Sequence, residues 1–409
     1  MSEVDRIVRN TLKNCIDTTY AYPLVIKSGE GCYLEDVDGK KFLDFNSNVC
    51  SCPIGYGHPE IVQLIEKIAK SGAHKVAGQD FFTEEQSQLA QKLLSIMPSN
   101  LNKVFFISTG TEAVENAIKL SFRKRSEALK KQPNELFGIS CYGAFHGRTL
   151  GSLTFTYSKN VHKKGYPELN VKRIKFKTED DKENEIKDVI RENPDEVAFV
   201  ITEVVQGEGG YNIASRKFIR ELREETERYR IPLIIDEVQS GLGRTGKWWG
   251  FENYGIVPDF VSSSKALQVG ATIFNEKFDP KEQGAVSSTW GGGSRIDLAV
   301  GLKTIEIIER EKLLKNAEDM GKYILKRIKD WEKDYQGVVV NTNGLGLMLR
   351  VEFDTKENRN FVEDKAFKDG LLLLGCGQKT IRLAPPLSIM EDDIDKGLDI
   401  MENQIKKIK

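Results

Sequence analysis

The stretch IPLIIDEVQSGLGRTG, residues 231–246, joins an apolar strand pattern to three glycines. Its end spells G-x-G-x-x-G, the pattern of a dinucleotide-binding turn, which needs a helix opening on the glycines and an acidic residue about 20 positions later. The next residues, KWWGFENYGIVPDF (247–260), contain adjacent tryptophans and the helix breakers Gly250, Gly255 and Pro258. The context therefore argues against a dinucleotide and directs attention to Asp236, which ends the apolar run.

The composition is that of an ordinary soluble globular protein. The chain has 409 residues, of which 39% are hydrophobic and 30% charged, and 60 basic against 61 acidic side chains leave a net charge of −1. The length suits two domains, with three as an alternative. The balanced charge gives no field that would attract nucleic acid or a membrane. A charged N-terminus, MSEVDRIVRN, and the lack of an apolar stretch of about 20 residues predict a cytoplasmic protein.

Cysteines and histidines show no metal-binding or disulfide pattern. The six cysteines are scattered, and the C-x-C spacing of Cys50 and Cys52 fits neither a zinc ribbon nor a disulfide framework. The four histidines, at positions 58, 74, 146 and 162, lack metal-ligand spacing. We expect free buried thiols and no metal.

Strand and helix patterns alternate in the middle of the chain. Helical periodicity covers 112–130 and 215–230. Predicted buried strands are KVFFIST (103–109), EVAFVITEVV (196–205), IPLIIDEV (231–238) and DFVSSSK (259–265). Apolar strands separated by helices indicate the α/β class, with a parallel sheet covered on both faces and ligands at the carboxyl ends of its strands.

The C-terminal part predicts a smaller α+β domain. Residues 294–335 have a helical pattern, with breaks expected near the glycines. The apolar segments LGLMLRVEF, GLLLLGCG and KTIRLAPPL follow, with helices around 360–368 and from 391. The N-terminal segment carries a hairpin signal at Asp38-Gly39 and is expected to join this domain. The predicted organisation is an N-terminal segment of the small domain over 1–55, a large domain over 56–296 and the rest of the small domain over 297–409.

Asp236 and Lys265 each end a predicted strand, so both are expected at one edge of the sheet. A buried carboxylate needs a cationic partner, and a structural Asp236–Lys265 ion pair is the simpler interpretation. The alternative is a pyridoxal phosphate site, where a lysine forms a Schiff base and an aspartate keeps the pyridinium nitrogen protonated.

A pyridoxal site also needs a place for the phosphate. The small-residue turn Thr109–Gly110–Thr111 joins a strand to a helix that begins at Glu112, and backbone N–H groups at a helix N-terminus bind phosphate. A strand-to-helix turn capped by a threonine explains the same residues without a ligand. The combination with Asp236 and Lys265 favours the pyridoxal site.

Over nearly its whole length the sequence resembles the class-III (omega) aminotransferases, which are pyridoxal phosphate enzymes of fold type I. This resemblance implies a large domain with a mainly parallel seven-stranded sheet and a smaller α+β domain. The matching stretches occur in order and are LEDVDGKKFLDF, GHPEIV, STGTEAVENAIKL, GAFHGRTLGSL, EVVQGEGG, IIDEVQSGLGRTGKWWGFENYGIVPDFVSSSKAL, SSTWGG and IRLAPPL.

The resemblance implies roles for residues around the cofactor ring. Lys265 resembles the lysine that binds the cofactor and then moves the substrate proton, and Asp236 matches the partner of the pyridinium nitrogen. Gln239 matches a residue near the phenolic oxygen. Phe145 takes the position that stacks on the ring, followed by His146.

The phosphate is expected at Gly110 and Thr111. Thr289 matches a phosphate ligand that the other subunit donates, which implies a homodimer with shared active sites. The glycines after Gln239 are then expected to turn the chain sharply rather than to bind phosphate.

Substrate binding is implied for Arg148, Arg382, Glu208 and Val49. Arg148 lies where relatives that recognise a distal carboxylate carry an arginine. Arg382 matches the arginine that holds the α-carboxylate of glutamate and 2-oxoglutarate. Glu208 matches a glutamate that pairs with this arginine when the donor has no carboxylate beside its reacting amine.

The donor is expected to carry a terminal amine at one end and a carboxylate at the other. The segments GAFHGR, NVHKKGYPEL, KALQVGA and SSTWGGG resemble L-lysine 6-aminotransferases most, although Gly293 stands where an asparagine is usual. Transfer of the ε-amine of lysine to 2-oxoglutarate would give glutamate and 2-aminoadipate 6-semialdehyde. 4-Aminobutyrate, ornithine and N-acetylornithine remain alternative donors, and an amino-acid racemase of the same fold is a different reaction class.

Overall fold

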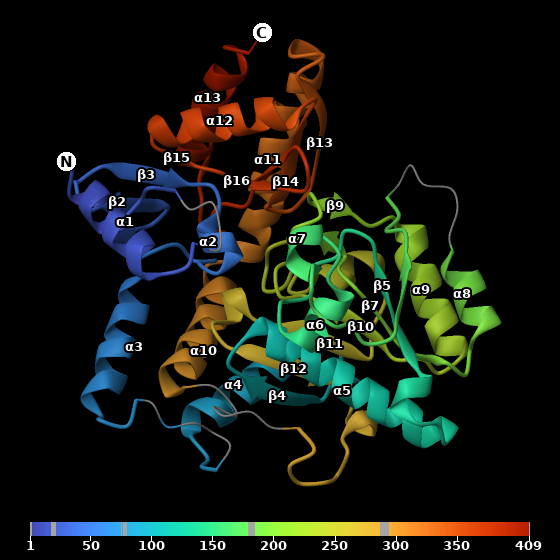
Figure 1. The fold of residues 1–409 in the computed structure, drawn as a ribbon. Coiled ribbons are helices and arrows are strands. Elements are labelled where there is room, and N and C mark those ends of the chain that lie inside the picture. Colours follow the sequence, from blue (N-terminus) through green and yellow to red (C-terminus); the bar gives the residue numbers. More distant parts are fainter. Residues whose placement is uncertain are drawn as a thin grey trace.

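The chain folds into a large helix-covered sheet and a smaller part that contains both termini (Figure 1). The structure is a computed structural model, which describes residues 2–17, 22–74, 76, 80–178, 185–286 and 294–408.

The large sheet confirms the predicted α/β class. Its seven strands have the order β4-β12-β11-β10-β7-β5-β6. β12 is antiparallel to both neighbours, and the other paired strands are parallel. The strands are β4 Lys103–Ile107, β5 Phe137–Cys141, β6 Val171–Ile174, β7 Val197–Thr202, β10 Leu233–Asp236, β11 Phe260–Ser263 and β12 Gly270–Phe274.

The strands predicted from the sequence did not include β5, β6 or the antiparallel β12. β12 follows β11 after a short 3₁₀ turn, η3 (Lys265–Leu267), and reverses direction without a crossover helix. An antiparallel neighbour needs only a short connection, so the alternation of strands and helices does not reveal it.

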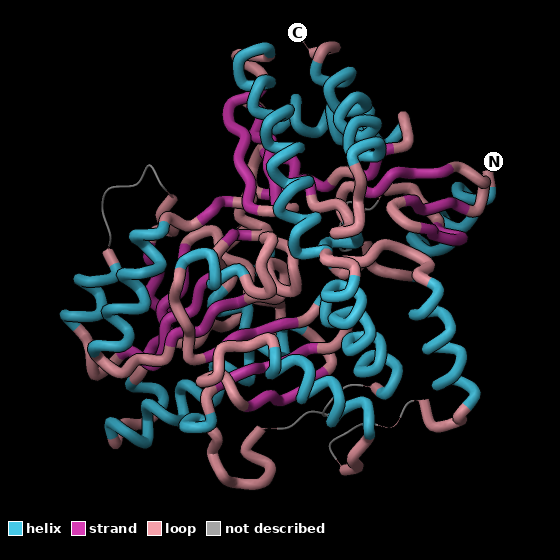
Figure 2. The backbone as a smooth tube through the Cα atoms, turned by 180° about the vertical axis from the view of Figure 1, so that it is seen from behind, coloured by secondary structure: helices cyan, strands magenta, loops and turns pink. Residues whose placement is uncertain are grey.

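Helices cover both faces of this sheet, as Figure 2 shows from behind. Ile234 of β10 packs in the cluster that contains Val114 and Ile118 of α5, whereas Ile235 packs in the cluster that contains Phe218 of α9. This alternation explains why β10 is apolar throughout. The helices of this part are α4 Glu84–Ser95, α5 Gly110–Leu129, α6 Leu150–Phe155, α7 Asn160–Lys163, α8 Ile186–Glu192 and α9 Arg216–Arg228, with the 3₁₀ turns η1 Pro133–Glu135, η2 Gly250–Tyr254 and η4 Glu276–Phe278. A two-stranded ribbon, β8 Val205–Gln206 with β9 Asn212–Ile213, lies beside the sheet.

The smaller part combines both ends of the chain. One sheet pairs β15 with β3 of the N-terminal segment in parallel, and the hairpin predicted at Asp38-Gly39 joins β2 to β3. Its strands are β1 Ile26–Glu30, β2 Tyr33–Asp36, β3 Lys41–Asp44 and β15 Leu371–Leu372, and a second sheet contains β13 Val339–Leu345, β14 Met348–Phe353, β17 Thr380–Leu383 and β16 Leu374–Cys376. The remaining helices are α1 Glu3–Asn14, α2 Ser47–Cys50, α3 Pro59–Lys70, α10 Arg295–Arg310, α11 Leu313–Asp334, α12 Lys356–Lys368 and α13 Glu391–Ile405. The predicted domain boundaries themselves stay a prediction.

The expected helix breaks at glycines were wrong. α10 and α11 are separated at Lys312, which has φ 56°, while Gly301 and Gly321 lie inside the helices. A Cβ on Gly301 would lie 2.4 Å from the Leu267 carbonyl oxygen, and one on Gly321 would lie 2.2 Å from that of Gly346. These glycines permit close packing against neighbouring backbone and do not end a helix.

The glycine-rich stretch 241–246 connects the two parts of the molecule. Gly243 and Gly246 have φ of 95° and 81°, and no α-helix opens on them. Arg244, between them, is buried and donates hydrogen bonds to the carbonyl oxygens of Leu347 and Pro385 and to Ser47 Oγ. The loop therefore anchors the large sheet to the smaller part, as a turn and not as a nucleotide site.

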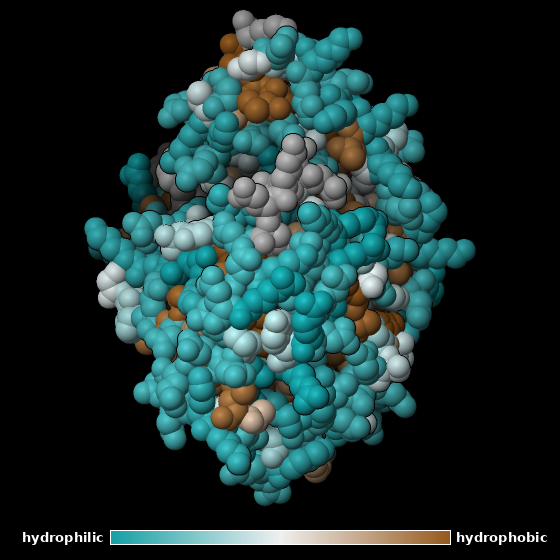
Figure 3. Space-filling view, turned by 90° about the vertical axis from the view of Figure 1, so that its right-hand side faces the viewer, coloured by the Kyte–Doolittle hydropathy of each residue, from teal (hydrophilic) through white to brown (hydrophobic). Residues whose placement is uncertain are grey.

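The surface shown in Figure 3 is mostly hydrophilic. Within the described ranges, no helix combines the length and apolar character that a membrane crossing requires. All six cysteines are free thiols, of which Cys15 is exposed, Cys52 half-buried and the others buried.

Candidate active site

Asp236 and Lys265 lie at the carboxyl edge of the large sheet, as predicted. Asp236 is the last residue of β10 and pairs in register with Ser262 of the parallel β11. Lys265 begins η3, three residues after Ser262, with φ 47°. Among the ion pairs of the described residues, none joins Asp236 to Lys265; the partner of Asp236 is His146. The structure therefore does not contain the Asp236–Lys265 ion pair that was the simpler interpretation of the sequence.

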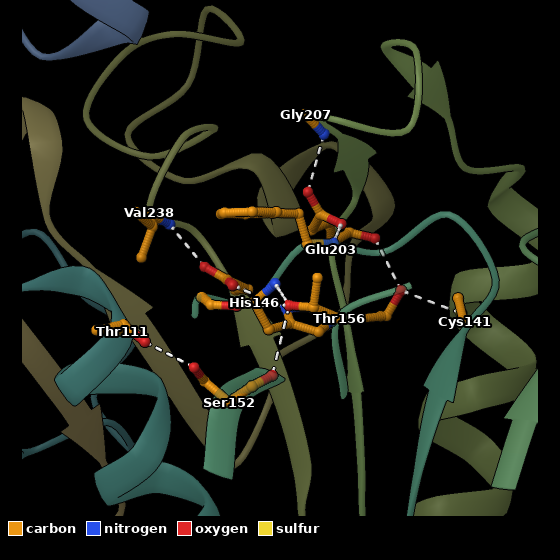
Figure 4. A network of polar contacts seen from close by, with 12 residues as sticks. Thr111, Cys141, His146, Ser152, Thr156, Glu203, Gly207 and Val238 are labelled. Atoms are coloured by element: carbon orange, nitrogen blue, oxygen red, sulfur yellow. Dashed lines mark hydrogen bonds and ion pairs between the residues drawn. The ribbon is translucent and has the colours of Figure 1, made fainter. Parts of the chain in front are cut away.

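His146 and a backbone N–H group hold the Asp236 carboxylate. His146 Nδ1 lies 2.8 Å from Asp236 Oδ2, and the Val238 N–H donates to Oδ1 at 3.0 Å (Figure 4). The His146 backbone N–H donates to Thr156 Oγ1 at 2.9 Å, which fixes the histidine. The Nε2 atom of His146 is buried without a partner among the described residues. Asp236 is thus oriented at the sheet edge by a backbone group two residues further along the chain and by a histidine from a distant segment.

The N-terminus of α5 lies next to the segments that follow β10 and β11. Thr109 caps the helix by accepting the Glu112 N–H, and a Cβ on Gly110 would lie 2.9 Å from Val238 Cγ1 and 3.2 Å from Ser264 Cβ. The Thr111 hydroxyl lies 2.6 Å from Ser152 Oγ and 2.9 Å from Thr149 Oγ1. Backbone N–H groups and hydroxyls at a helix N-terminus can bind an anion, and this helix start contacts the residues next to Asp236 and Lys265 in the sequence.

Lys265 has an environment suited to a nucleophilic amine. Burial lowers the pKa of Lys265, while Cys50, Glu208 and Asp236 oppose this shift. The neutral amine is the form that attacks a carbonyl or takes up a proton. Gln268 stabilises the turn by donating from Nε2 to the carbonyl oxygens of Lys265 at 2.9 Å and Ser51 at 2.7 Å.

Phe145 and Gln239 flank this edge. The Phe145 ring is half-buried, with the His162 ring edge-on at 5.9 Å and the Arg148 guanidinium carbon at 5.8 Å. Gln239 Oε1 is buried without a partner among the described residues, and a Cβ on Gly207 would lie 2.7 Å from it. The Gln239 Oε1 atom can therefore accept a hydrogen bond that no described residue donates.

Arg382, which is buried, forms an ion pair with the half-buried Glu208. Arg382, on β17, donates from Nη2 to Glu208 Oε1 at 2.7 Å, while its Nε and Nη1 have no partner among the described residues. Burial would raise the pKa of Glu208, but Arg382, with Lys159 and Lys265, outweighs it and lowers the pKa to about 2. Glu208 in turn raises the pKa of Arg382 against the effect of burial. Both groups stay charged at neutral pH.

Arg148 is exposed and only loosely held. Its Nη2 lies 3.4 Å from His162 Nε2, and it has no ion pair among the described residues. Burial, together with Arg148 and Lys159, lowers the pKa of His162 against the effect of Glu208 and so favours the neutral imidazole. An uncommitted arginine at this position is suited to a carboxylate that enters from solvent.

Val49 lies in an unusual left-handed turn. Ser47, Asn48, Val49 and Cys50 have φ of 43°, 49°, 55° and 68°, a conformation that is strained for a β-branched residue. Asp44 Oδ1 supports the turn by accepting the N–H groups of Asn46 at 2.7 Å and Ser47 at 3.0 Å. The Cys50 thiol lies 3.6 Å from the Tyr211 hydroxyl, whose ring is 5.8 Å from the Arg382 guanidinium carbon. Val49 is therefore adjacent to the residues that surround Arg382.

Sequence reasoning missed several residues at the site. Glu203, Tyr211 and Cys50 are buried beside the predicted residues. Glu203 had a signal, because it is a charged residue inside the apolar run EVAFVITEVV. Tyr211 and Cys50 are distant in sequence, and no local pattern connects them. Thr289 lies outside the described residues.

The residues present fit pyridoxal phosphate. Unpartnered buried atoms occur on Gln239 and Arg382, and both lie close to Asp236 or Lys265 in the fold. The site offers an amine for the aldehyde of the cofactor, a carboxylate for its ring nitrogen and a helix N-terminus for its phosphate.

Such a site, on a sheet of this topology, defines a pyridoxal phosphate-dependent enzyme of fold type I. The sequence model of the family described as aminotransferase class-III matches residues 16–405, and the chain belongs to that family. Class-III aminotransferases depend on pyridoxal phosphate and move an amino group from a donor to an oxo acid. The predicted family, fold and cofactor are confirmed.

Relatives within the family differ in the reaction that their names state. Acetylornithine aminotransferase of Archaeoglobus fulgidus is 35% identical over 395 residues, which cover 96% of this chain and 98% of the relative. Alanine/serine racemase of Pyrococcus horikoshii is 31% identical over 419 residues, with coverage of 94% and 86%. Lysine aminotransferase from M. tuberculosis has a TM-score of 0.92 at 24% identity over 100% of both chains, a likeness of fold alone.

Proposed function

We propose that the chain is an ω-aminotransferase, which moves the terminal amine of an amino acid to 2-oxoglutarate and forms glutamate. The observation that carries this proposal is the partly buried Glu208–Arg382 ion pair, with its 2.7 Å contact. Glutamate and 2-oxoglutarate have a carboxylate next to the reacting carbon, which Arg382 would bind. A CH₂–NH₂ donor end has none, so Glu208 supplies the charge that Arg382 would otherwise lack.

The other charged residues have separate roles in the proposed reaction. Lys265, whose pKa is lowered by burial, binds the cofactor and then carries the proton at the substrate carbon. Asp236, held by His146, keeps a positive charge on the ring nitrogen favourable. When bound, pyridoxal phosphate supplies an electron-withdrawing ring that stabilises negative charge on that carbon. Arg148 binds the carboxylate at the far end of the substrate. Val49 contacts the carbon chain of the substrate between its two ends.

The sequence predicts L-lysine as the donor and 2-aminoadipate 6-semialdehyde as the product. N-acetylornithine is the second candidate, because the curated relatives at 35% and 32% identity are acetylornithine aminotransferases. The charges near Arg148 also favour it. Lys159, 3.6 Å from Glu208, and Arg148 both lower the pKa of His162 against the opposing effect of Glu208, so two cationic side chains lie near this part of the site. An acetylated amine adds no positive charge there, whereas the α-ammonium group of lysine does.

A single-turnover experiment tests both levels of the proposal. Cofactor-loaded enzyme is mixed with L-lysine, L-ornithine, 4-aminobutyrate or N-acetylornithine, and the change in visible absorbance and the product are followed. We expect one donor to react much faster than the others, and glutamate to form only when 2-oxoglutarate is added afterwards. Formation of a D-amino acid without consumption of an oxo acid would show a racemase and contradict the proposal.

We further infer a homodimer, in which Thr289 of one subunit contributes to the phosphate site of the other. Class-III aminotransferases typically form dimers. Phe81 and Phe82, which are 66% and 100% exposed, are apolar residues of the kind that a second copy covers. Light scattering on the purified protein should give twice the chain mass. The cytoplasmic location expected from the sequence stays a prediction.

A further inference from the structure

Glu203 is a buried carboxyl group to which none of the roles above applies. It follows β7, is 6% exposed, and accepts two backbone N–H groups. The Phe145 N–H donates to Oε2 at 3.1 Å, and the Gly207 N–H donates to Oε1 at 2.8 Å. Figure 4 shows the carboxylate between Gly207 and His146.

The two N–H groups belong to segments that carry different parts of the site. Phe145 begins the segment that continues with His146, which contacts Asp236 at 2.8 Å. Gly207 directly precedes Glu208, which contacts Arg382 at 2.7 Å. One carboxylate therefore connects the residues around the cofactor ring to the residues that bind the substrate carboxylate.

This position is unfavourable for a charge. Burial raises the pKa of Glu203 to about 7, and Asp236 adds to the rise, whereas His146 and the two N–H groups oppose it. An apolar side chain would avoid the penalty but would leave both N–H groups without an acceptor. The contacts to both segments account for a carboxylate here.

Glu237 provides a matched comparison within the same chain. It is also buried, its pKa is also raised to about 7 by burial, and it also accepts two backbone N–H groups, from Gly250 at 2.9 Å and Phe251 at 2.8 Å. Those groups belong to η2, which carries none of the proposed site residues. Glu237 also accepts the Ser240 hydroxyl at 2.6 Å, and it thus resembles Glu203 in burial and backbone contacts without its two connections.

We propose that Glu203 is a positioning residue, which holds the Phe145–His146 segment and the Glu208 loop at the spacing that exchange between an ω-amine donor and an oxo acid requires. This inference deepens the proposed function and rests on it. Because both segments are anchored to one side chain, a displacement of either one is transmitted to the other.

The test compares Glu203→Gln with Glu237→Gln in the cofactor-loaded enzyme. A glutamine has one acceptor oxygen, and its NH₂ group meets the second N–H donor, so only one of the two contacts survives. For Glu203→Gln we expect a changed visible circular dichroism of the bound cofactor and a fall of about 10- to 100-fold in kcat/KM for donor and oxo acid alike. For Glu237→Gln we expect a similar loss of thermal stability with the wild-type spectrum and rates. If Glu203→Gln does not fold, Glu203→Asp replaces it in the same comparison. The aspartate keeps the charge but is too short to reach both N–H groups.

The inference predicts one further signature. The effect of Glu208→Gln on the donor half-reaction should be smaller in the Glu203→Gln background, because the loop is already displaced. A wild-type spectrum and wild-type rates for Glu203→Gln, or equal changes in Glu237→Gln, would overturn the inference. Absence of ω-amine transfer by the wild-type enzyme would instead refute the proposed function, and the circular dichroism comparison would still test the role of Glu203 at the cofactor.

Discussion

The Asp236 end and the Arg382 end of the site differ in how completely their charged groups are partnered. At the Asp236 end, both carboxylate oxygens accept contacts, from Val238 at 3.0 Å and His146 at 2.8 Å. At the Arg382 end, only Nη2 has a partner, and Nε and Nη1 have none among the described residues. The first end belongs to segments that pack around the large sheet, while Arg382 comes from β17 of the smaller part.

This difference fits two kinds of task. A group that keeps one charge throughout a reaction is best held rigidly, and Asp236 is held on both oxygens. A group that must accept different substrate ends needs a partner that can be exchanged, and Glu208 is that partner for Arg382. Each end therefore predicts its own response to mutation.

The largest effect is expected for Lys265→Ala, at the Asp236 end of the site. Removing the amine removes the nucleophile that binds the cofactor, so turnover should fall to the uncatalysed level and the visible absorbance of the lysine-bound cofactor should disappear. Absorption spectra and an activity assay check this, with Lys247→Ala as a control. A variant that stayed coloured and active would place the reactive lysine elsewhere.

Glu208→Gln should have the next largest effect, and it should be selective. Without the carboxylate, Arg382 remains charged and unpaired in front of an uncharged donor end, so the rate of the donor half-reaction should fall by about 10- to 100-fold. The half-reaction of glutamate brings its own carboxylate and should change by less than about 3-fold. Stopped-flow absorbance on each half-reaction measures this, and equal losses in both would contradict an exchangeable partner.

Arg148→Met should have a smaller effect, confined to binding. The Arg148 side chain is exposed, so its contact with a distal carboxylate should contribute about 1 kcal/mol, equivalent to a rise of about 5- to 10-fold in KM with little change in kcat. Steady-state kinetics with the best donor tests this. A diamine without the distal carboxylate serves as the control, and it should react equally well with both enzymes.

The last expected effect concerns the stability of the fold, not catalysis, as a function of pH. The pKa of Glu208 lies at about 2 in the folded chain and near its ordinary value of 4.5 when unfolded, so its ion pair stabilises the fold fully above about pH 4.5. That contribution should be lost progressively as the pH falls toward about 2. The free energy of unfolding of the wild type should therefore exceed that of Glu208→Gln by about 1–3 kcal/mol at pH 7, and the difference should shrink at pH 3. Urea unfolding at several pH values measures it, and a difference that grows in acid would be the opposite of this expectation.

Much of the Asp236 end of the site was predictable from the sequence. The apolar run before Asp236 and the serines before Lys265 predicted two strand ends, and the turn before Glu112 predicted a helix start that the structure places at Gly110. These features are local, because strand alternation, helix periodicity and capping depend on neighbours a few residues apart. The resemblance to class-III aminotransferases then connected them to one cofactor.

The contacts between distant segments were not predictable in this way. His146 and Asp236 are 90 residues apart, and Arg382 and Glu208 are 174 apart. The antiparallel β12 and the left-handed turn at Val49 were also not predicted. A short connection between antiparallel strands and a strained turn held by hydrogen bonds leave no periodic pattern in the sequence. Glu203 was visible only as an interruption of an apolar run.

By itself, the sequence determined the α/β class, the positions of Asp236 and Lys265 at the ends of predicted strands, and the rejection of GLGRTG (241–246) as a nucleotide turn. The tertiary structure alone decided that Arg244 in that stretch anchors the smaller part to the large sheet, that Asp236 pairs with His146 rather than with Lys265, and that Glu203 joins two segments of the site. The physical reason is burial. A charged group that is removed from water must find its partner among whatever segments the packing brings close, and these segments lie far apart in the chain.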